Sequence, residues 1–201
     1  MSAPETGASP SGGCRVIFLT GFMGSGKSTL GRALGARPGW RYVDLDDFME
    51  ERHGMTVREM FSHHGEQWFR AEESRMLREA AEMGSECGAG VLVVGCGGGT
   101  PCHGDNMEWM NSRGLTVLLQ ASDEVLLRRL TEAQEQRPLL AGMDASALAE
   151  FIRTRQAERA GYYGRTAMRI CSDRLESEEQ IEDTVREFMA MAGVNALNPD
   201  M

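Results

Sequence analysis

Long apolar stretches are missing from this sequence of 201 residues. No apolar run approaches the roughly 20 residues that a bilayer-spanning helix needs, so we expect no membrane partner. The first 13 residues are rich in Ser, Gly, Ala and Pro and contain no apolar segment of the kind that marks a secretory signal. We therefore expect residues 1–13 to form a disordered leader ahead of a cytoplasmic domain.

An excess of positive charge is also missing. The chain has 21 Lys and Arg residues against 30 Asp and Glu residues, which gives a formal net charge of −9. The net negative charge of the chain repels nucleic acid, so we expect no nucleic-acid partner. It can still bind a small anionic ligand, provided that cationic side chains gather at the site.

Paired cysteine motifs are missing as well. The five cysteines are odd in number, no Cys-x-x-Cys pair occurs, and no spacing of Cys and His suits zinc. Free thiols in a reducing cytosol are the simplest interpretation of this pattern.

What the chain does contain is a series of short apolar segments that alternate with amphipathic ones. Continuous apolar residues are typical of strands covered on both faces, and strands that alternate with helices indicate a parallel sheet. The pattern predicts an α/β fold, a three-layer sandwich with a five-stranded parallel sheet. The expected strands are Arg15–Thr20, Arg41–Leu45, Val91–Val94, Thr116–Leu119 and Ala167–Cys171. The clearest helical patterns are Trp68–Glu82, Glu124–Ala133, Ala145–Ala160 and Glu178–Met191.

A glycine-rich loop directly follows the first expected strand. Residues 21–29 read GFMGSGKST, which fits the pattern GxxxxGK[ST], and the helix-forming segment Leu30–Leu34 comes next. In such a loop the backbone N–H groups turn inward onto phosphate oxygens, and the N-terminal end of the next helix favours the same anion. We expect Lys27 to bridge the β- and γ-phosphates of ATP and Ser28 to ligate Mg²⁺. The residues of this loop expected to hold the nucleotide are Gly24, Ser25, Gly26, Lys27, Ser28 and Thr29.

Two carboxylates, Asp44 and Asp46, end the second expected strand. Residues two apart on a strand share a face, so both side chains should point to the same side, beside the glycine-rich loop. One can hold a water of the Mg²⁺ shell, and the other can accept a proton from an attacking hydroxyl. Asp47 is expected to face elsewhere and to cap the next helix.

Further motifs make the chain similar to a known family. From Arg15 to about Cys171 the sequence resembles the shikimate kinase family. Each of the motifs that carry this resemblance is only moderately specific by itself, but all of them together in this order and spacing are highly specific. The motifs in order are GFMGSGKST, Asp44-x-Asp46, Gly65-Glu66-x-x-Phe69-Arg70 with Glu73, Gly97-Gly98-Gly99, Arg137-Pro138-Leu139-Leu140 and Arg159-x-x-x-Tyr163.

The resemblance implies a P-loop kinase fold with a lid and an ATP-dependent activity. ATP and Mg²⁺ would be the cofactors, and the γ-phosphate would pass to the 3-hydroxyl of shikimate, a step toward the aromatic amino acids. By resemblance, Asp46 would bind the shikimate hydroxyls and act as the base. Arg70 and Arg159 would hold the carboxylate, and Gly98 would offer its backbone N–H.

Three further roles are implied by the same resemblance. Asp44 would serve the metal together with the loop serine, and Arg137 would reach the transferring phosphate from the lid. An arginine would stack on adenine, for which Arg129 is the first candidate and Arg128 competes.

We expect one kinase domain over residues 14–193, acting as a monomer. Its substrate-binding segment would cover about 45–73 and its lid about 131–144, with a flexible tail at 194–201. A kinase of gluconate or another small hydroxy acid is one alternative, although it gives no reason for the arginine motifs. A nucleotide-binding module that has lost catalysis is another. The intact set of Lys27, Ser28, Asp44, Asp46 and Arg137 argues against it.

Overall fold

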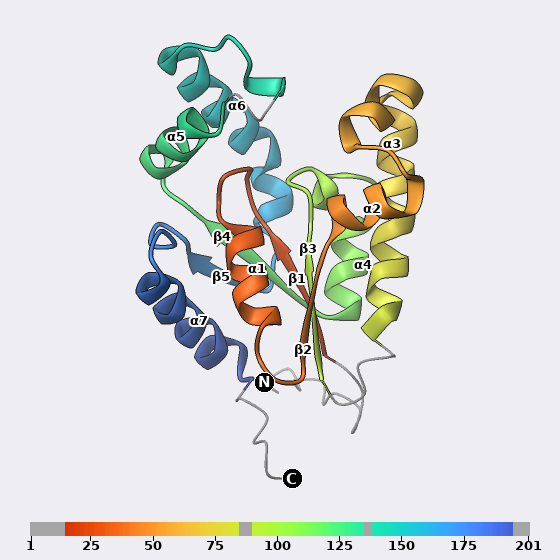
Figure 1. Ribbon diagram of the computed structural model, residues 1–201, viewed down its shortest axis with the longest axis vertical. Helices are drawn as coiled ribbons and strands as arrows, with labels where there is room; N and C mark the ends of the chain where they lie inside the picture. Colours follow the sequence, from red (N-terminus) through yellow and green to blue (C-terminus); the bar gives the residue numbers. More distant parts are fainter. Residues whose placement is uncertain (1–14, 85–89, 135–137, 195–201) are drawn as a thin grey trace, which may run out of the picture.

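A five-stranded parallel sheet forms the centre of the computed structural model, which describes residues 15–84, 90–134 and 138–194. The strands lie in the order β2-β3-β1-β4-β5, and every neighbouring pair is parallel. Their bounds are Arg15–Thr20 for β1, Trp40–Asp44 for β2, Val91–Gly95 for β3, Leu115–Gln120 for β4 and Met168–Cys171 for β5. The predicted sheet is thereby confirmed (Figure 1).

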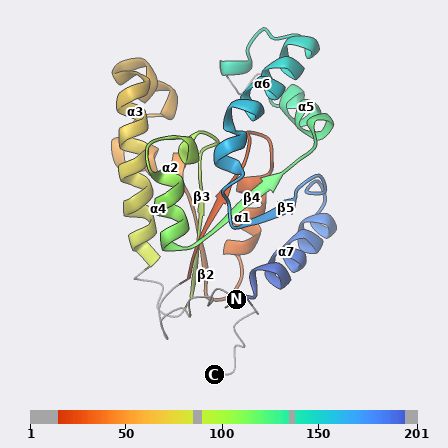
Figure 2. The same ribbon diagram turned by 180° about the vertical axis from the view of Figure 1, so that it is seen from behind.

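Helices cover both faces of the sheet, which gives the three expected layers (Figures 1 and 2). In β1, Ile17 and Leu19 point into one apolar cluster with α1 and α7, while Phe18 points into another with α3 and α4. All three side chains are fully buried, which explains the continuous apolar sequence of the strand. The helices are α1 Lys27–Gly35, α2 Leu45–His53, α3 Val57–Glu82, α4 Asn106–Arg113, α5 Asp123–Glu132, α6 Ala145–Tyr163 and α7 Glu178–Ala192.

Most boundaries differ from the sequence prediction by one to three residues, and two of the differences affect the interpretation. The second strand ends at Asp44, and Leu45 is already the first residue of α2. The predicted helix Trp68–Glu82 is the second part of α3, which begins eleven residues earlier behind a capping box formed by Thr56 and Glu59. Gly65, at φ 78° and ψ 171°, breaks α3. Only glycine adopts this conformation readily, so the helical period is interrupted there.

A third apolar cluster joins α5 to α6 above one side of the sheet. It takes in part of the predicted lid, because Leu140 of the short 3₁₀ turn Pro138–Leu140 is fully buried. Gln134 fixes the same segment by donating from Nε2 to the carbonyls of Leu140 and Met143, each at 2.7 Å. The lid residues 135–137, the leader and residues 195–201 lie outside the described part of the chain.

Within the described residues, no helix combines the length and apolar character that crossing a membrane requires. At the C-terminal end, Val194 is still buried in the cluster beside α7, although the predicted tail starts at that residue.

Helix α1 packs unusually close to β2, and this closeness can be tested. A Cβ atom on Gly31 would lie 2.1 Å from Cε2 of Tyr42, whereas one on Gly161 of α6 would meet nothing within 4 Å. Gly31→Ala should therefore destabilise the fold by about 1–3 kcal/mol through overpacking. Gly161→Ala, the same change in an open helical position, should stabilise it by about 0.5–1 kcal/mol. Urea unfolding of both variants measures the two effects, and equal effects would contradict this packing.

Candidate active site

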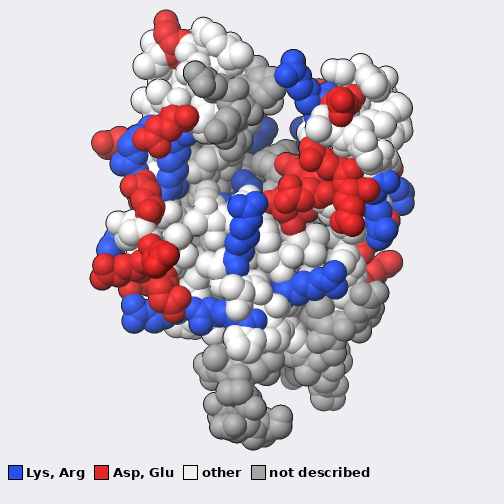
Figure 3. All heavy atoms as spheres, viewed as in Figure 1, with Lys and Arg blue, Asp and Glu red and all other residues white. Residues whose placement is uncertain are grey.

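The glycine-rich loop lies at the carboxyl end of β1 and runs directly into α1. Gly24 and Gly26 have φ angles of 79° and 92°, so the loop curls in the left-handed region before the helix starts at Lys27. The loop borders a pocket of about 330 Å³. In Figure 3 the molecule is hollowed between its two upper lobes, and basic side chains are visible inside the hollow.

Five of the six predicted loop residues line this pocket: Gly24, Gly26, Lys27, Ser28 and Thr29. Nζ of Lys27 donates to the carbonyl oxygens of Gly21 at 2.8 Å and Phe22 at 3.0 Å, which folds the ammonium back over the loop. The sixth residue, Ser25, is fully buried, and its hydroxyl has no hydrogen-bond partner among the described residues. The loop thus presents a cation and a helix N-terminus at one place, the arrangement that binds a phosphate chain.

Ser28 and Asp44 form a pair of oxygen ligands beside Lys27. The Ser28 hydroxyl donates to Oδ2 of Asp44 at 3.0 Å, and the Tyr42 hydroxyl donates to the same oxygen at 2.8 Å. Burial, with the nearby Asp44 charge, raises the pKa of Tyr42, so its hydroxyl stays a donor. Magnesium prefers hard oxygen ligands, takes one or two from the protein and completes its shell with phosphates and water. The Ser28 and Asp44 oxygens fit that ion.

Asp46 does not lie on a strand, which corrects the prediction that two strand carboxylates share a face. Asp44 ends β2 and caps α2, accepting the backbone N–H of Asp46 at 3.2 Å. Asp46 is in the first turn of the helix, and both residues nevertheless line the pocket. The cap is therefore Asp44, and Asp47 was wrongly predicted as the cap.

The environment of Asp46 is that of a base. Burial, followed by the charges of Asp44 and Glu73, raises the pKa of its carboxyl to about 7, and the ammonium of Lys27 opposes this rise. A base is most effective when its pKa is near the working pH. Asp46 can accept a proton near neutral pH, next to the site where the phosphate would arrive.

Arg70 of α3 is held in place by a buried carboxylate. Its Nη1 donates to Oε2 of Glu73 at 2.7 Å, and Oε1 of Glu73 accepts the hydroxyl of Thr100 at 2.6 Å. Glu73 is 1% exposed, so the guanidinium is fixed against the turn that follows β3. A Cβ on Gly99 would lie 2.8 Å from Nη2 of Arg70, which explains the need for glycine there. The sequence alone gave no role to Thr100.

Arg159 of α6 approaches the same glycine turn from the opposite side. Its Nη1 would lie 2.8 Å from a Cβ on Gly98, and this nitrogen is buried without a hydrogen-bond partner among the described residues. Its guanidinium carbon is 5.5 Å from the ring centroid of Phe22. Tyr163, one helical turn further on, donates its hydroxyl to the carbonyl of Gly98 at 2.8 Å. A buried guanidinium nitrogen without an acceptor is costly, and an anionic ligand would relieve that cost.

The structure distinguishes the two candidate adenine arginines. Arg129 lines the nucleotide pocket and donates to the carbonyls of Gly24 at 3.3 Å, Ser172 at 3.0 Å and Asp173 at 3.1 Å. Arg128 lies on the exposed face of α5 and pairs with Glu176, outside the residues that line the pocket. Arg137, the predicted catalytic residue of the lid, lies outside the described residues.

Three neighbours of the site were missed from sequence. Tyr42 was seen only as part of an apolar strand, and its place two residues before Asp44 was the available signal. Leu175, which lines the pocket beside Gly26, belongs to a loop after β5 that carries no motif. For Thr100, its position next to the glycine run was the only signal.

A phosphate-binding loop and two carboxylates line one pocket, and two arginines lie against the glycine turn beside it. These features define a P-loop kinase for a small anionic substrate. The family model for shikimate kinase matches residues 23–190. The chain belongs to the shikimate kinase family.

Curated relatives and solved structures agree with this assignment. The chain is 41% identical over 179 residues to a shikimate kinase of Bacteroides fragilis, which covers 89% of this chain and 97% of the relative. The crystal structure of the enzyme from Bacteroides thetaiotaomicron superposes with a TM-score of 0.82 at 41% identity, covering 88% and 97% of the two chains. The enzyme from Acinetobacter baumannii in complex with shikimate gives a TM-score of 0.73 at 27% identity, covering 92% and 96%.

The raised pKa of Asp46 predicts a change in stability with pH. In the unfolded chain this carboxyl titrates near 3.8, so the folded protein binds the proton more tightly. The free energy of unfolding therefore falls as the pH rises from about 4, and the loss is complete above about pH 7, where Asp46 is ionised in the folded protein as well. Asp46→Asn should raise the free energy of unfolding by about 1–4 kcal/mol at about pH 8 and change it little near pH 4.

Thermal unfolding at both pH values measures this difference. The control Glu51→Gln, at an exposed position of the same helix, should show no such dependence on pH. A stabilisation by Asp46→Asn of equal size at both pH values would contradict the raised pKa.

Proposed function

We propose that this chain transfers the γ-phosphate of ATP to the 3-hydroxyl of shikimate, giving ADP and shikimate 3-phosphate. The observation that carries the proposal is the buried, unpartnered guanidinium nitrogen of Arg159 beside Gly98, with Arg70 at the adjacent Gly99. Two arginine forks match one carboxylate. On the other side of the pocket stands the phosphate loop, so acid and nucleotide would meet over Asp46.

In this mechanism Asp46 accepts the proton of the shikimate hydroxyl as the oxygen attacks phosphorus. Lys27 swings from its two loop carbonyls to the phosphate oxygens, and the loop N–H groups neutralise the developing charge. Ser28 and Asp44 would hold Mg²⁺, which supplies further charge neutralisation on the phosphate oxygens when it is bound. The remaining task of the protein is positioning, since phosphoryl transfer needs little covalent help.

Other residues complete the proposed site. Gly98 offers its backbone N–H to the substrate, and Gly24, Ser25, Gly26 and Thr29 surround the phosphates. Arg129 stacks on the adenine, supported by its place between the phosphate loop and the segment after β5. Arg137 reaches the γ-phosphate from the lid, a role that rests on the family resemblance.

The rival substrates are disfavoured on two grounds. A polyol carries no carboxylate and would not require two guanidinium groups on adjacent glycines of one turn. Gluconate does carry a carboxylate, and it is disfavoured by the family to which the chain belongs. An inactive nucleotide-binding module would have no use for a carboxylate with a pKa near 7 in the pocket.

We propose further that the enzyme acts as a cytoplasmic monomer without a nucleic-acid or membrane partner. The net charge of −9 disfavours anionic polymers and surfaces. The described cysteines, Cys96, Cys102 and Cys171, are free thiols, in keeping with a reducing compartment.

The reaction is tested by ADP formation from ATP, Mg²⁺ and shikimate, with gluconate as the rival acceptor. Lys27→Ala should abolish nearly all turnover, because it removes the ammonium that bridges the phosphates. Lys27 is the one lysine of the sequence, so an amine-reactive label reports on it almost alone. ATP should protect it from labelling in the wild type. Full turnover by Lys27→Ala, or turnover with gluconate and none with shikimate, would refute the proposal.

Arg70 and Arg159 are both tested by binding experiments, and thermal unfolding should distinguish between them. Arg70→Lys and Arg159→Lys keep the charge but lose the planar fork, so each should weaken shikimate binding by about 1.5–3 kcal/mol and leave ATP binding near normal. Only Arg70→Lys should also lower the Tm, because buried Glu73 loses its partner.

Arg155→Lys is the matched control, since Arg155 lies on α6 and pairs with Glu158 at the surface. Calorimetric titrations with shikimate and with ATP give the two affinities. An equal loss for both ligands in Arg159→Lys would indicate misfolding and not a lost substrate contact.

A further inference from the structure

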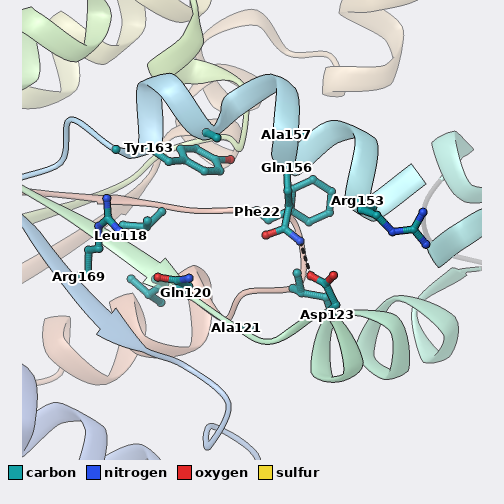
Figure 4. A pocket seen from close by; sticks show the side chains of 14 residues that line it. Phe22, Leu118, Gln120, Ala121, Asp123, Arg153, Gln156, Ala157, Tyr163 and Arg169 are labelled. Carbon is teal, nitrogen blue, oxygen red and sulfur yellow. Dashed lines mark hydrogen bonds between the residues drawn. The ribbon is translucent and has the colours of Figure 1, made fainter. Parts of the chain in front are cut away.

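A second pocket, of about 390 Å³, lies against another face of α6 (Figure 4). It is formed by α6, the end of β4, Phe22 at the start of the phosphate loop, and Arg169 of β5. None of its lining residues belongs to the lining of the nucleotide pocket. It is a separate concavity, and its size is within the range of small-molecule sites, about 300–1,000 Å³.

Part of the lining of this pocket is apolar, and the rest is polar or charged. Phe22, Leu118, Ala121 and Tyr163 all line it and are 3–7% exposed. Figure 4 shows the Phe22 and Tyr163 rings near α6, with Leu118 on the strand below them. Two aromatic rings and an aliphatic floor favour a flat apolar group.

One charge in the pocket is left without a partner. The backbone of Arg169 belongs to β5, but its side chain has no hydrogen bond, ion pair or ring contact with any other residue in the described ranges 15–84, 90–134 and 138–194. The other charged groups are occupied, since Arg153 pairs with Glu150 and Asp123 accepts Nε2 of Gln156 at 2.7 Å.

The Arg169 guanidinium faces the end of α6. Its Nη2 would lie 3.9 Å from a Cβ on Gly164, the C-cap of that helix. The helix terminus carries about half a negative charge, so it balances only part of the positive charge. A positive charge at the mouth of an apolar pocket selects an anion with an apolar body.

We propose that this pocket is an effector site for a small carboxylate with a flat apolar body, bound through Arg169. The ring would lie between Phe22, Tyr163 and Leu118, and the carboxylate would reach the guanidinium. The ligand class follows from the Arg169 guanidinium, which has no partner among the described residues, and from the aromatic and aliphatic side chains that line the same pocket.

The occupant would be coupled to the substrate residues through two side chains. Phe22 lines the pocket and also carries the Arg159 guanidinium over its ring. Tyr163 lines the pocket and holds the carbonyl of Gly98. Burial raises the pKa of Tyr163 to about 12, so this hydroxyl remains a donor. A ligand that fixes both rings stabilises the arrangement in which Arg159 and Gly98 face the substrate.

Linkage is reciprocal, so the effector should tighten shikimate binding. The expectation that the effector tightens shikimate binding rests on the function proposed above. The existence of a ligand site in this pocket does not rest on that function. The two are therefore tested by separate measurements.

Binding is tested with 4-fluorobenzoate, observed by ¹⁹F NMR, on the full chain saturated with shikimate. Shikimate is present because a benzoate could otherwise enter the substrate site. The probe should bind, and Arg169→Gln should weaken it by about tenfold or more. Arg186→Gln, which removes an exposed charge on α7, is the matched control and should change nothing. The uncharged 4-fluorobenzyl alcohol should bind much more weakly.

A second variant tests the position of the ring. Ala157 is an exposed residue of α6 that lines the pocket, and Ala157→Leu fills the chamber with little cost to the helix. It should weaken the probe as well. Absence of binding at millimolar concentration in the presence of shikimate, or unchanged binding in Arg169→Gln, would overturn the site.

Coupling is tested by the KM for shikimate with and without the probe. The KM should fall severalfold in the wild type and stay constant in Arg169→Gln, whose basal kcat should be normal. A KM that does not fall overturns the coupling. If the chain fails to phosphorylate shikimate at all, the proposed function fails, while Arg169-dependent probe binding without shikimate still decides the site.

Discussion

The register of three parallel strands is the constraint on which the site depends. Gly95, the last residue of β3, pairs with Leu19 of β1 on one side and with Asp44 of β2 on the other. The three strands therefore end at nearly one level, and the segments that follow them start side by side. These segments are the phosphate loop, the first turn of α2 and the glycine turn. Ligands of open α/β sheets bind at this edge for the same reason.

At the carboxyl ends of the strands, some charged side chains are paired with each other and others are left available to a ligand. Buried Glu73 has both oxygens engaged, one by Arg70 and one by Thr100. Asp46, two residues after Asp44, has no ion-pair partner among the described residues, and burial raises the pKa of its carboxyl to about 7. The same edge thus holds one carboxylate that fixes a cation and another that can exchange a proton. An acidic protein needs such local arrangements to bind two anions.

Helix α6 connects the substrate residues with a part of the surface that has no assigned role. Arg159 leaves one face of the helix toward the glycine turn, while Gln156, Ala157 and Tyr163 border the second pocket. The packing of Phe22 between them brings the phosphate loop into the same contact. A helix held on both faces is suited to pass a binding event from one side to the other, because packed elements shift as units.

The sequence by itself determined the sheet and the phosphate loop, and it predicted most of the candidate site residues. Continuous apolar runs predicted all five strands, and the loop motif fixed Lys27 and Ser28, because these patterns follow from local geometry. The turn carrying Asp46 was assigned wrongly, because a strand end and a helix start look alike over four residues when the cap is itself an aspartate. Only the tertiary structure decided which arginine lines the pocket beside the phosphate loop, that Tyr42 donates to Asp44, and that the Arg169 side chain at the second pocket has no partner among the described residues. Each of these depends on which distant segments pack together, and no local period or spacing along the chain records that.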